Sequence, residues 1–282
     1  MEIALAGDII FGKGVSTLAR ARGLDYFFRR VAPILRSADW VVANMEGCIS
    51  DRGTPKDKEY TFRAPPELAP TLRWAGIPMV SLGNNHSMDY GAVALEDTLE
   101  HLRRAGVWYA GAGRNRAQAS QAVYLDDGAV RVAIVCFTAV VPKGFPAGEH
   151  TPGVAILSDV LPTLRNARRN AQVVIAIPHW GDEGKTVPNA KQQRIARILA
   201  DTGVDLVVGH HPHVVQGYAK VGAMHTVYSV GNFVHTPLSR LSRVGWLVRA
   251  QIDRHGIQRL EAQPLWLEAG QPRPEGRAIR WI

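Results

Sequence analysis

Short apolar runs alternate along the chain with stretches in which apolar positions recur at helical spacing. Runs that predict buried strands occupy residues 3–6, 40–43, 77–82, 107–110, 173–177, 204–208 and 226–230. Helical spacing predicts helices over residues 25–36, 65–75, 91–104, 159–170 and 188–202. Strands that alternate with helices in this way are typical of an α/β fold with parallel strand pairing.

Two regions depart from this alternation and predict antiparallel strands. Residues 123–125 and 130–137 flank Asp126-Asp127-Gly128, which is a hairpin turn signal. Two alternating stretches between residues 244 and 267 meet at His255-Gly256 and predict another hairpin. We therefore expect mixed sheets.

Nothing in the sequence divides the chain into separate units. We find no internal repeat and no linker rich enough to mark a boundary, so we predict a single domain over residues 1–270. Residues 271–282 contain Pro272 and Pro274, and we expect them to form a poorly ordered tail.

Composition narrows the class of protein. The chain has 282 residues and 46% hydrophobic content, which suffices for a sizeable core. No apolar run approaches the roughly 18 residues of a membrane-spanning helix, and no signal peptide follows Met1. Cys48 and Cys136 have no ligand-type spacing and lie in or beside apolar stretches, which favours two reduced, buried thiols. We expect a cytoplasmic protein without a membrane span, of undetermined oligomeric state.

The formal net charge of +8 raises the question of a nucleic-acid partner. Only seven of the 33 basic residues are lysine, and the arginines are scattered over predicted helix faces. The sequence has no basic run of five or more residues and none of the basic–aromatic interleaving of single-strand binders. We therefore expect no nucleic-acid partner, and the excess charge favours an anionic small or polymeric substrate.

Polar side chains gather directly after the strand predicted at residues 77–82. Asn84, Asn85, His86 and Asp89 stand there within six residues. A turn needs only one or two residues of the Gly, Asn and Asp type, so a turn followed by a helix cap leaves several of these groups unexplained. In open α/β sheets, ligands bind outside the carboxyl ends of the strands. The stretch is therefore the first candidate site.

Other predicted strands end in the same kinds of side chain. These residues are Asp8, Asn44, Glu46, His179, His211 and His213. Each one alone could be an ordinary turn or hydrogen-bonding residue, but imidazoles two residues apart on an extended chain lie on one face and can chelate. Carboxylate, amide and imidazole ligands together suit Zn²⁺, Mn²⁺ or Fe²⁺, or a harder ion such as Mg²⁺ or Ca²⁺. We predict a divalent metal site.

A series of motifs runs in one order over about residues 3 to 235. The motifs are Gly7-Asp8, Asn44-x-Glu46, Tyr60-x-Phe62-Arg63-Ala64-Pro65, Asn84-Asn85-His86-x-x-Asp89-Tyr90-Gly91, His179-Trp180-Gly181, His211-Pro212-His213-Val214 and Ser229-x-Gly231-Asn232-Phe233. In this order they resemble the calcineurin-like metallophosphoesterases, and more closely the CapA family of poly-γ-glutamate capsule synthesis proteins. The resemblance implies an α/β fold, a four-layer α/β/β/α sandwich of mixed sheets of the metallo-dependent phosphatase type, with metals at one edge.

The resemblance also implies roles for individual residues. His86 matches the catalytic acid, and we expect Asp89, three residues later, to orient or supplement it. Ile10 stands where the superfamily has a histidine ligand, so one metal position lacks a ligand. The residues that match metal ligands are Asp8, Glu46, Asn85, His179, His211 and His213.

Together these features predict a metal-dependent, hydrolase-like enzyme. Lys58, Arg63 and Asn232 are expected to bind an anionic peptide, glutamyl or phosphoester substrate, and the loop over residues 139–154 is expected to overhang the site. Phosphoester hydrolysis, amide hydrolysis or support of ligation, and proton exchange beside a carbonyl all stay open. The alternatives are a non-catalytic polymer-binding subunit of a capsule synthesis complex and a cytoplasmic peptide-modifying enzyme of the hydrolase or epimerase type.

Overall fold

The computed structural model describes residues 1–236 and 239–282, and most of its strands form two mixed sheets. The larger sheet has nine strands in the order β18-β17-β16-β1-β2-β5-β6, with β15 beside β1 and β19 beside β17. Its strands are β1 (Glu2–Ile9), β2 (Trp40–Met45), β5 (Met79–Ser81), β6 (Trp108–Ala110), β15 (Asn232–Val234), β16 (Val244–Asp253), β17 (Gly256–Glu268), β18 (Gln271–Pro274) and β19 (Ile279–Arg280).

The smaller sheet has six strands in the order β13-β14-β12-β11-β9-β8. The four central strands are parallel and the two edge strands are antiparallel, so the prediction of mixed sheets is confirmed. Its strands are β8 (Val123–Asp126), β9 (Arg131–Thr138), β11 (Val173–His179), β12 (Leu206–Val208), β13 (Val215–Val221) and β14 (Met224–Val230). Two short pairs complete the strands: β3 (Cys48–Ile49) with β4 (Arg63–Ala64), and β7 (Ala112–Gly113) with β10 (Gly153–Val154).

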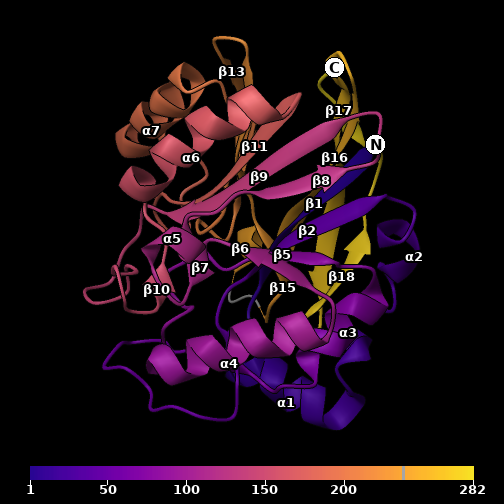
Figure 1. Ribbon diagram of the computed structural model, residues 1–282. Helices are drawn as coiled ribbons and strands as arrows, with labels where there is room; N and C mark the ends of the chain where they lie inside the picture. The colour runs from indigo at the N-terminus through magenta and orange to yellow at the C-terminus, as the bar shows by residue number, and fades with distance from the viewer. Residues whose placement is uncertain (237–238) are drawn as a thin grey trace.

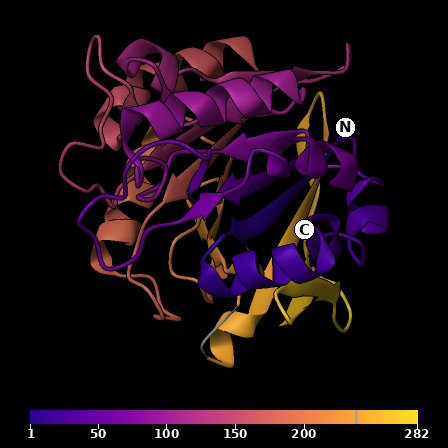
Figure 2. The same cartoon turned by 90° about the horizontal axis from the view of Figure 1, so that it is seen from below.

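Helices cover the outer face of each sheet, which gives the four-layer α/β/β/α sandwich (Figures 1 and 2). Those on the nine-stranded sheet are α1 (Lys13–Arg22), η1 (Asp25–Phe27), α2 (Ala32–Leu35), α3 (Leu68–Ala75) and α4 (Gly91–Arg104). Those on the six-stranded sheet are α5 (Arg116–Ala119), α6 (Leu157–Asn170) and α7 (Ala190–Asp201), and a short η2 (Leu241–Arg243) precedes β16. In the described ranges, no helix has the length and apolar character needed to cross a membrane.

Strand β1 shows how the sequence builds the layers. Its side chains point alternately to the two faces of the sheet, as in any strand. Ile3 and Leu5 belong to the apolar layer between the sheets, whereas Ala4 and Ala6 belong to the layer beneath the helices. A strand buried on both faces needs a continuous apolar run, and for that reason residues 3–6 show no alternation of polar and apolar positions.

The predicted strands and the two hairpins are present, but the segment predicted as a helix over residues 25–36 is not one helix. It forms η1 and the one-turn helix α2, and Pro33 stands in the first turn of α2. Proline has no amide hydrogen to donate, so a helix cannot continue through it undisturbed from the residues before it. Helix α1 and strand β13 were not predicted. Only Val15 of α1 is fully buried, which leaves little periodic signal.

Residues 271–282, expected to be a poorly ordered tail, instead contain strands β18 and β19, which both pair with β17. Strand β18 lies at the edge of the nine-stranded sheet. Prolines are tolerated on an edge strand because one side of the strand needs no hydrogen-bond donors. Pro272 and Pro274 therefore belong to an edge strand, and ordered structure continues through them.

Candidate metal centre

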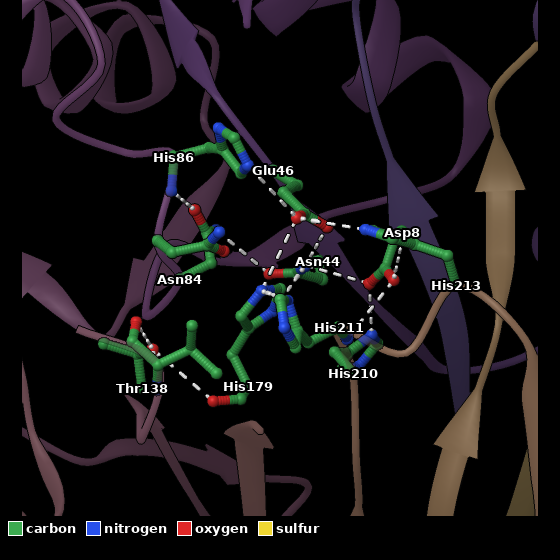
Figure 3. Close-up of polar contacts among 12 residues, drawn as sticks. Asp8, Asn44, Glu46, Asn84, His86, Thr138, His179, His210, His211 and His213 are labelled. Atoms are coloured by element: carbon green, nitrogen blue, oxygen red, sulfur yellow. Dashed lines mark hydrogen bonds and ion pairs between the residues drawn. The ribbon is translucent and has the colours of Figure 1, made fainter. Parts of the chain in front are cut away.

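The predicted metal-ligand residues converge where strands of both sheets end. We call Asp8, Glu46, Asn85, His179, His211 and His213 the ligand cluster. Asp8 lies near the end of β1, opposite Asn44 of β2. His179 ends β11 and forms a bridge to His210 after β12. The side chains of five cluster residues point toward one another: Asp8, Glu46, His179, His211 and His213 (Figure 3).

Glu46 lies at the centre of the cluster and is completely buried. Its Oε1 atom lies 3.5 Å from Nε2 of His179, 3.7 Å from Nε2 of His213 and 3.9 Å from Nε2 of His86. Oε1 makes no hydrogen bond with any described residue, and the same is true of the buried Oδ1 of Asn85. A buried polar atom without a partner is costly. A carboxylate oxygen of this kind among three imidazoles fits a divalent cation.

Three sets of ligand atoms each lie within 4.8 Å of one another. Glu46, His211 and His213 each belong to two of these sets, and Glu46 is the carboxylate among the three. The sets are Glu46 with His179 and His211, Asp8 with Glu46 and His213, and Glu183 with His211 and His213.

Asn44 and His210 hold the carboxylates of the cluster in place. Nδ2 of Asn44 donates to Oδ1 of Asp8 at 2.9 Å and to Oε2 of Glu46 at 3.4 Å. Nδ1 of His210 lies 2.7 Å from Oδ1 of Asp8. Oδ1 of Asn44 accepts a hydrogen bond from Asn84 at 3.1 Å. Partners of this kind orient metal ligands and tune their basicity.

His211 and His213 reach the cluster by a turn, and the expectation of an extended chain between them is wrong. Their φ angles are 96° and 56°, in the left-handed region that non-glycine residues seldom adopt. Hydrogen bonds on both sides of the turn fix it: the amide of His211 lies 3.4 Å from Oδ2 of Asp8, and Gly184 donates to the carbonyl of Pro212 at 2.8 Å. Residues with strained backbone conformations of this kind occur frequently at functional sites.

Burial and charge shift the pKa values of the cluster in opposite directions. Burial raises the pKa of Glu46 to about 7, although His213 opposes it. Burial alone would lower the pKa of His213, but the carboxylates of Glu46 and Asp8 outweigh it and raise that pKa to about 9. Burial lowers the pKa of His211 to about 2 and holds the pKa of His179 well below its usual value. The latter two imidazoles are therefore neutral and able to bind a metal at neutral pH.

His86 and Asp89 form a dyad beside the cluster. Nδ1 of His86 lies 2.6 Å from Oδ2 of Asp89, and both residues are buried. Asp89 also accepts hydrogen bonds from Lys58 Nζ at 2.5 Å and from the amide of Phe62 at 2.8 Å. The ring of Phe62 packs against that of His86, with centroids 4.3 Å apart. His86 is thereby fixed with its Nε2 toward Glu46.

The residues predicted to bind substrate lie in different places. Lys58 donates to Asp89 and to the carbonyl of Asn85 at 2.7 Å, so it holds the dyad. Asn232 donates to the carbonyls of His213 and Ser242, and its Oδ1 lies 3.1 Å from Nδ1 of His213. The polar groups of Lys58 and Asn232 therefore already make hydrogen bonds within the protein. Arg63, the third residue predicted to bind substrate, lies outside the ligand cluster, and its guanidinium stacks on the ring of Tyr90.

The loop over residues 139–154 packs against the molecule and reaches the dyad. Phe145 and Ala147 in this loop are buried. The ring of Phe145 lies 5.1 Å from Nζ of Lys58, within the range of a cation–π contact. The loop therefore covers the cation that holds Asp89.

Three residues near the cluster were not predicted as part of the site: His210, Glu183 and His235. The carboxylate of Glu183 is exposed but is close to two histidines of the cluster. Nδ1 of His235 is buried without a partner among the described residues, and its ring stacks 6.2 Å from that of His213. Tertiary contacts place these three residues near the cluster, and no local sequence motif predicts such contacts. Ile10, where the superfamily has a histidine, is buried.

The sandwich is a metallophosphoesterase-like fold. A novel phosphatase from Mycoplasma pneumoniae has a similar structure, with a TM-score of 0.57 over 100% of this chain and 93% of that one at 13% identity. A hypothetical protein from Thermus thermophilus gives a TM-score of 0.54 over 100% of this chain and 99% of that one at 17% identity. At such identities the likeness concerns the fold.

Sequence comparison gives the family. The model of the bacterial capsule synthesis protein family PGA_cap matches residues 2–237, and the chain belongs to this family. The PGA biosynthesis protein CapA of Bacillus subtilis strain 168 is 32% identical over 97% of this chain and 73% of that protein. The capsule biosynthesis protein CapA of Bacillus anthracis is 31% identical over 99% of this chain and 70% of that protein. The resemblance to the CapA family seen in the motifs is confirmed.

Proposed function

We propose that this chain is a metal-dependent, hydrolase-like enzyme that acts on an anionic glutamyl chain. The observation that carries the proposal is the dyad of His86 and Asp89, placed with Nε2 of His86 3.9 Å from the central carboxylate of Glu46. Membership in the capsule synthesis family supports a glutamyl substrate, because two of its relatives are named for the synthesis of PGA or of capsule.

The ligand cluster would hold one or two divalent ions. Two of its buried oxygens lack partners among the described residues, and two of its imidazoles are neutral. A bound divalent ion would supply Lewis acidity, which polarises a carbonyl or phosphoryl oxygen or acidifies water.

The dyad supplies proton transfer. A hydrogen bond donated from Nδ1 to Oδ2 of Asp89, 2.6 Å away, would leave the lone pair on Nε2, which faces the cluster. Lys58 and the amide of Phe62 hold both carboxylate oxygens of Asp89, so the imidazole cannot turn away. His86 can therefore accept a proton at Nε2 from an attacking group and return it to a leaving group.

Replacement of His86 tests the proposal directly. His86→Ala should keep the metal but lower turnover by about 100-fold to 10,000-fold, the usual contribution of a positioned acid or base. The matched control is His255→Ala, since His255 is exposed. Metal content is measured by elemental analysis. Turnover is measured with a synthetic γ-linked glutamate oligomer and, for the phosphoester alternative, with p-nitrophenyl phosphate.

The outcome separates an enzyme from a binding subunit. Near-full turnover in His86→Ala would contradict the acid–base role, and a parent protein that binds the oligomer without converting it would favour the non-catalytic polymer-binding alternative. Metal content unchanged by His211→Ala combined with His213→Ala would contradict the metal site itself. We also propose a cytoplasmic location, on the two free and buried thiols Cys48 and Cys136, and cell fractionation would test it.

A further inference from the structure

A cavity of about 570 Å³ lies beside the dyad and contains none of the ligand cluster. Helix α1 forms one side of it. The segment over residues 61–66, with Ser50 and Asp51, forms another, and Tyr90 closes it toward the dyad. A cavity of this size can accept several groups of a polymer chain.

The charges around this cavity are unbalanced. Lys13, Arg20 and Arg63 line it, and Asp51 is the one acidic residue among the lining residues. No carboxylate of the described residues lies within ion-pair distance of any of these three cations, so none is neutralised by the protein. We call the cavity and these three cations the cationic pocket.

Some other arginines of the chain are neutralised by acidic neighbours. Arg103 and Arg104 on α4, for example, both pair with Glu100 at 2.8 and 2.7 Å. Unpaired cations gathered around one hollow raise the local concentration of anions.

Two features fix the pocket and add to its positive potential. The guanidinium of Arg63 stacks on the ring of Tyr90 at 4.3 Å, which gives this side chain a defined place on the wall. Helix α1 begins at the pocket with Lys13, and its first turn has no acidic residue and no side-chain cap from Gly12. The partial positive charge of a helix N-terminus is therefore not offset there.

The cationic pocket and the dyad share a wall. Tyr90 directly follows Asp89, and the lining residues Thr61 and Arg63 flank Phe62. Phe62 packs on His86 on one side, and on the other a Cβ at Gly12 would meet its ring at 3.5 Å. A chain with one unit at His86 would thus have its neighbouring units at the pocket.

We infer that the cationic pocket binds the free carboxylates of the units that adjoin the reacting unit of an acidic peptide chain, so that it selects a polycarboxylate over a neutral substrate. This inference rests on the proposed function for the identity of the chain, but the pocket itself needs no metal.

The test measures binding of a fluorescein-labelled γ-linked octaglutamate by fluorescence polarisation to protein stripped with EDTA. Lys13→Glu combined with Arg20→Glu should weaken binding about tenfold or more, since negative charges placed against an anionic ligand repel it. The control is Arg22→Glu combined with Arg194→Glu, which changes the net charge equally with two exposed arginines outside the pocket. Melting temperatures confirm that each variant is folded.

Equal affinity of the pocket variant and the control variant would overturn the inference, and so would a parent protein that does not bind octaglutamate. Polyphosphate of the same charge serves as a second probe, and binding of polyphosphate without octaglutamate would also overturn it. Because the protein is metal-free in this assay, the measured affinity for octaglutamate does not depend on whether the proposed metal-dependent activity is correct.

Discussion

Glu46 carries a buried oxygen, Oε1, that accepts no hydrogen bond from any described residue. In the metal-free chain its pKa is about 7, against an ordinary value of 4.5. A raised carboxyl pKa means that the folded chain holds a proton that the unfolded chain has lost. The stability that this proton contributes is present below pH 4.5 and is lost as the pH rises through 7.

Glu46→Gln should therefore have opposite effects on stability and on metal binding. At pH 8 the metal-free variant should melt at a higher temperature than the parent, because it no longer buries a charged carboxylate, and at pH 4 the difference should vanish. Its affinity for Mn²⁺ should fall by at least about tenfold. Differential scanning fluorimetry and titration calorimetry measure the two effects, with exposed Glu149→Gln as control. A metal-free variant less stable than its parent at pH 8 would contradict this account.

The two thiols give a second prediction for single residues. Cys48 and Cys136 are free and buried, and burial raises the pKa of each to about 12. Since the thiolate is the reactive form, neither should react with iodoacetamide at pH 8 in the folded protein. Both should react in guanidinium chloride, and intact-mass spectrometry counts the adducts. A rapid adduct in the folded protein would show that the thiol is accessible or ionised.

Among the elements, the turn between β5 and α4 carries the most chemistry, and Asn84 holds it together. Its Oδ1 accepts hydrogen bonds from the amide of His86 and from the hydroxyl of Ser87, both at 3.0 Å. Its Nδ2 donates to Asn44 and to the carbonyl of Met45. The Asn-Asn-His stretch thus has one asparagine, Asn84, that holds the turn, and a second, Asn85, whose buried Oδ1 has no partner among the described residues.

Asn84→Ala should destabilise the protein by about 3 kcal/mol, because buried groups on His86 and Met45 would lose their partners. Asn170→Ala should change stability by less than about 0.5 kcal/mol, since Asn170 is exposed and bonds only within its own helix. Urea unfolding of both variants measures the difference. Equal stabilities would mean that water replaces Asn84 in the turn.

The position of the site was predictable from the sequence because the carboxyl ends of parallel strands meet at one edge. The apolar runs that end at Asp8, Glu46 and His179 were enough to predict where the site lies. The turn at His211 was not predictable, because its left-handed backbone follows from contacts with Asp8 and with the 181–188 loop. Helix α1 was missed for a related reason: it covers the sheet with few buried residues, so its apolar pattern is faint.

For the molecule as a whole, the ligand cluster is a junction between the two sheets. Asp8, Glu46 and Asn85 come from the ends of β1, β2 and β5 in the nine-stranded sheet. The histidines come from the ends of β11 and β12 in the six-stranded sheet. Apart from this edge, apolar side chains between the sheets hold them together. A bound divalent ion would therefore join the two halves of the sandwich.

Removal of the metal should lower the melting temperature of the whole chain. A ligand that binds only the folded state stabilises it by about 2.7 kcal/mol at a concentration of 100 times its Kd. For a chain of this size each kcal/mol moves the melting temperature by roughly 2–4 °C, so saturating Mn²⁺ added to EDTA-stripped protein should raise it by roughly 5–10 °C. Differential scanning calorimetry with and without the ion measures the shift.

The shift should depend on ligands from both sheets, which distinguishes a junction from general ion binding. His211→Ala with His213→Ala should abolish it, and so should Asp8→Asn, although the two changes lie in different sheets. His150→Ala with His255→Ala should leave it intact, because these imidazoles are exposed and do not belong to the ligand cluster. A melting temperature that does not respond to Mn²⁺ in the parent protein, or that responds equally in all variants, would mean that no ion joins the sheets at this edge.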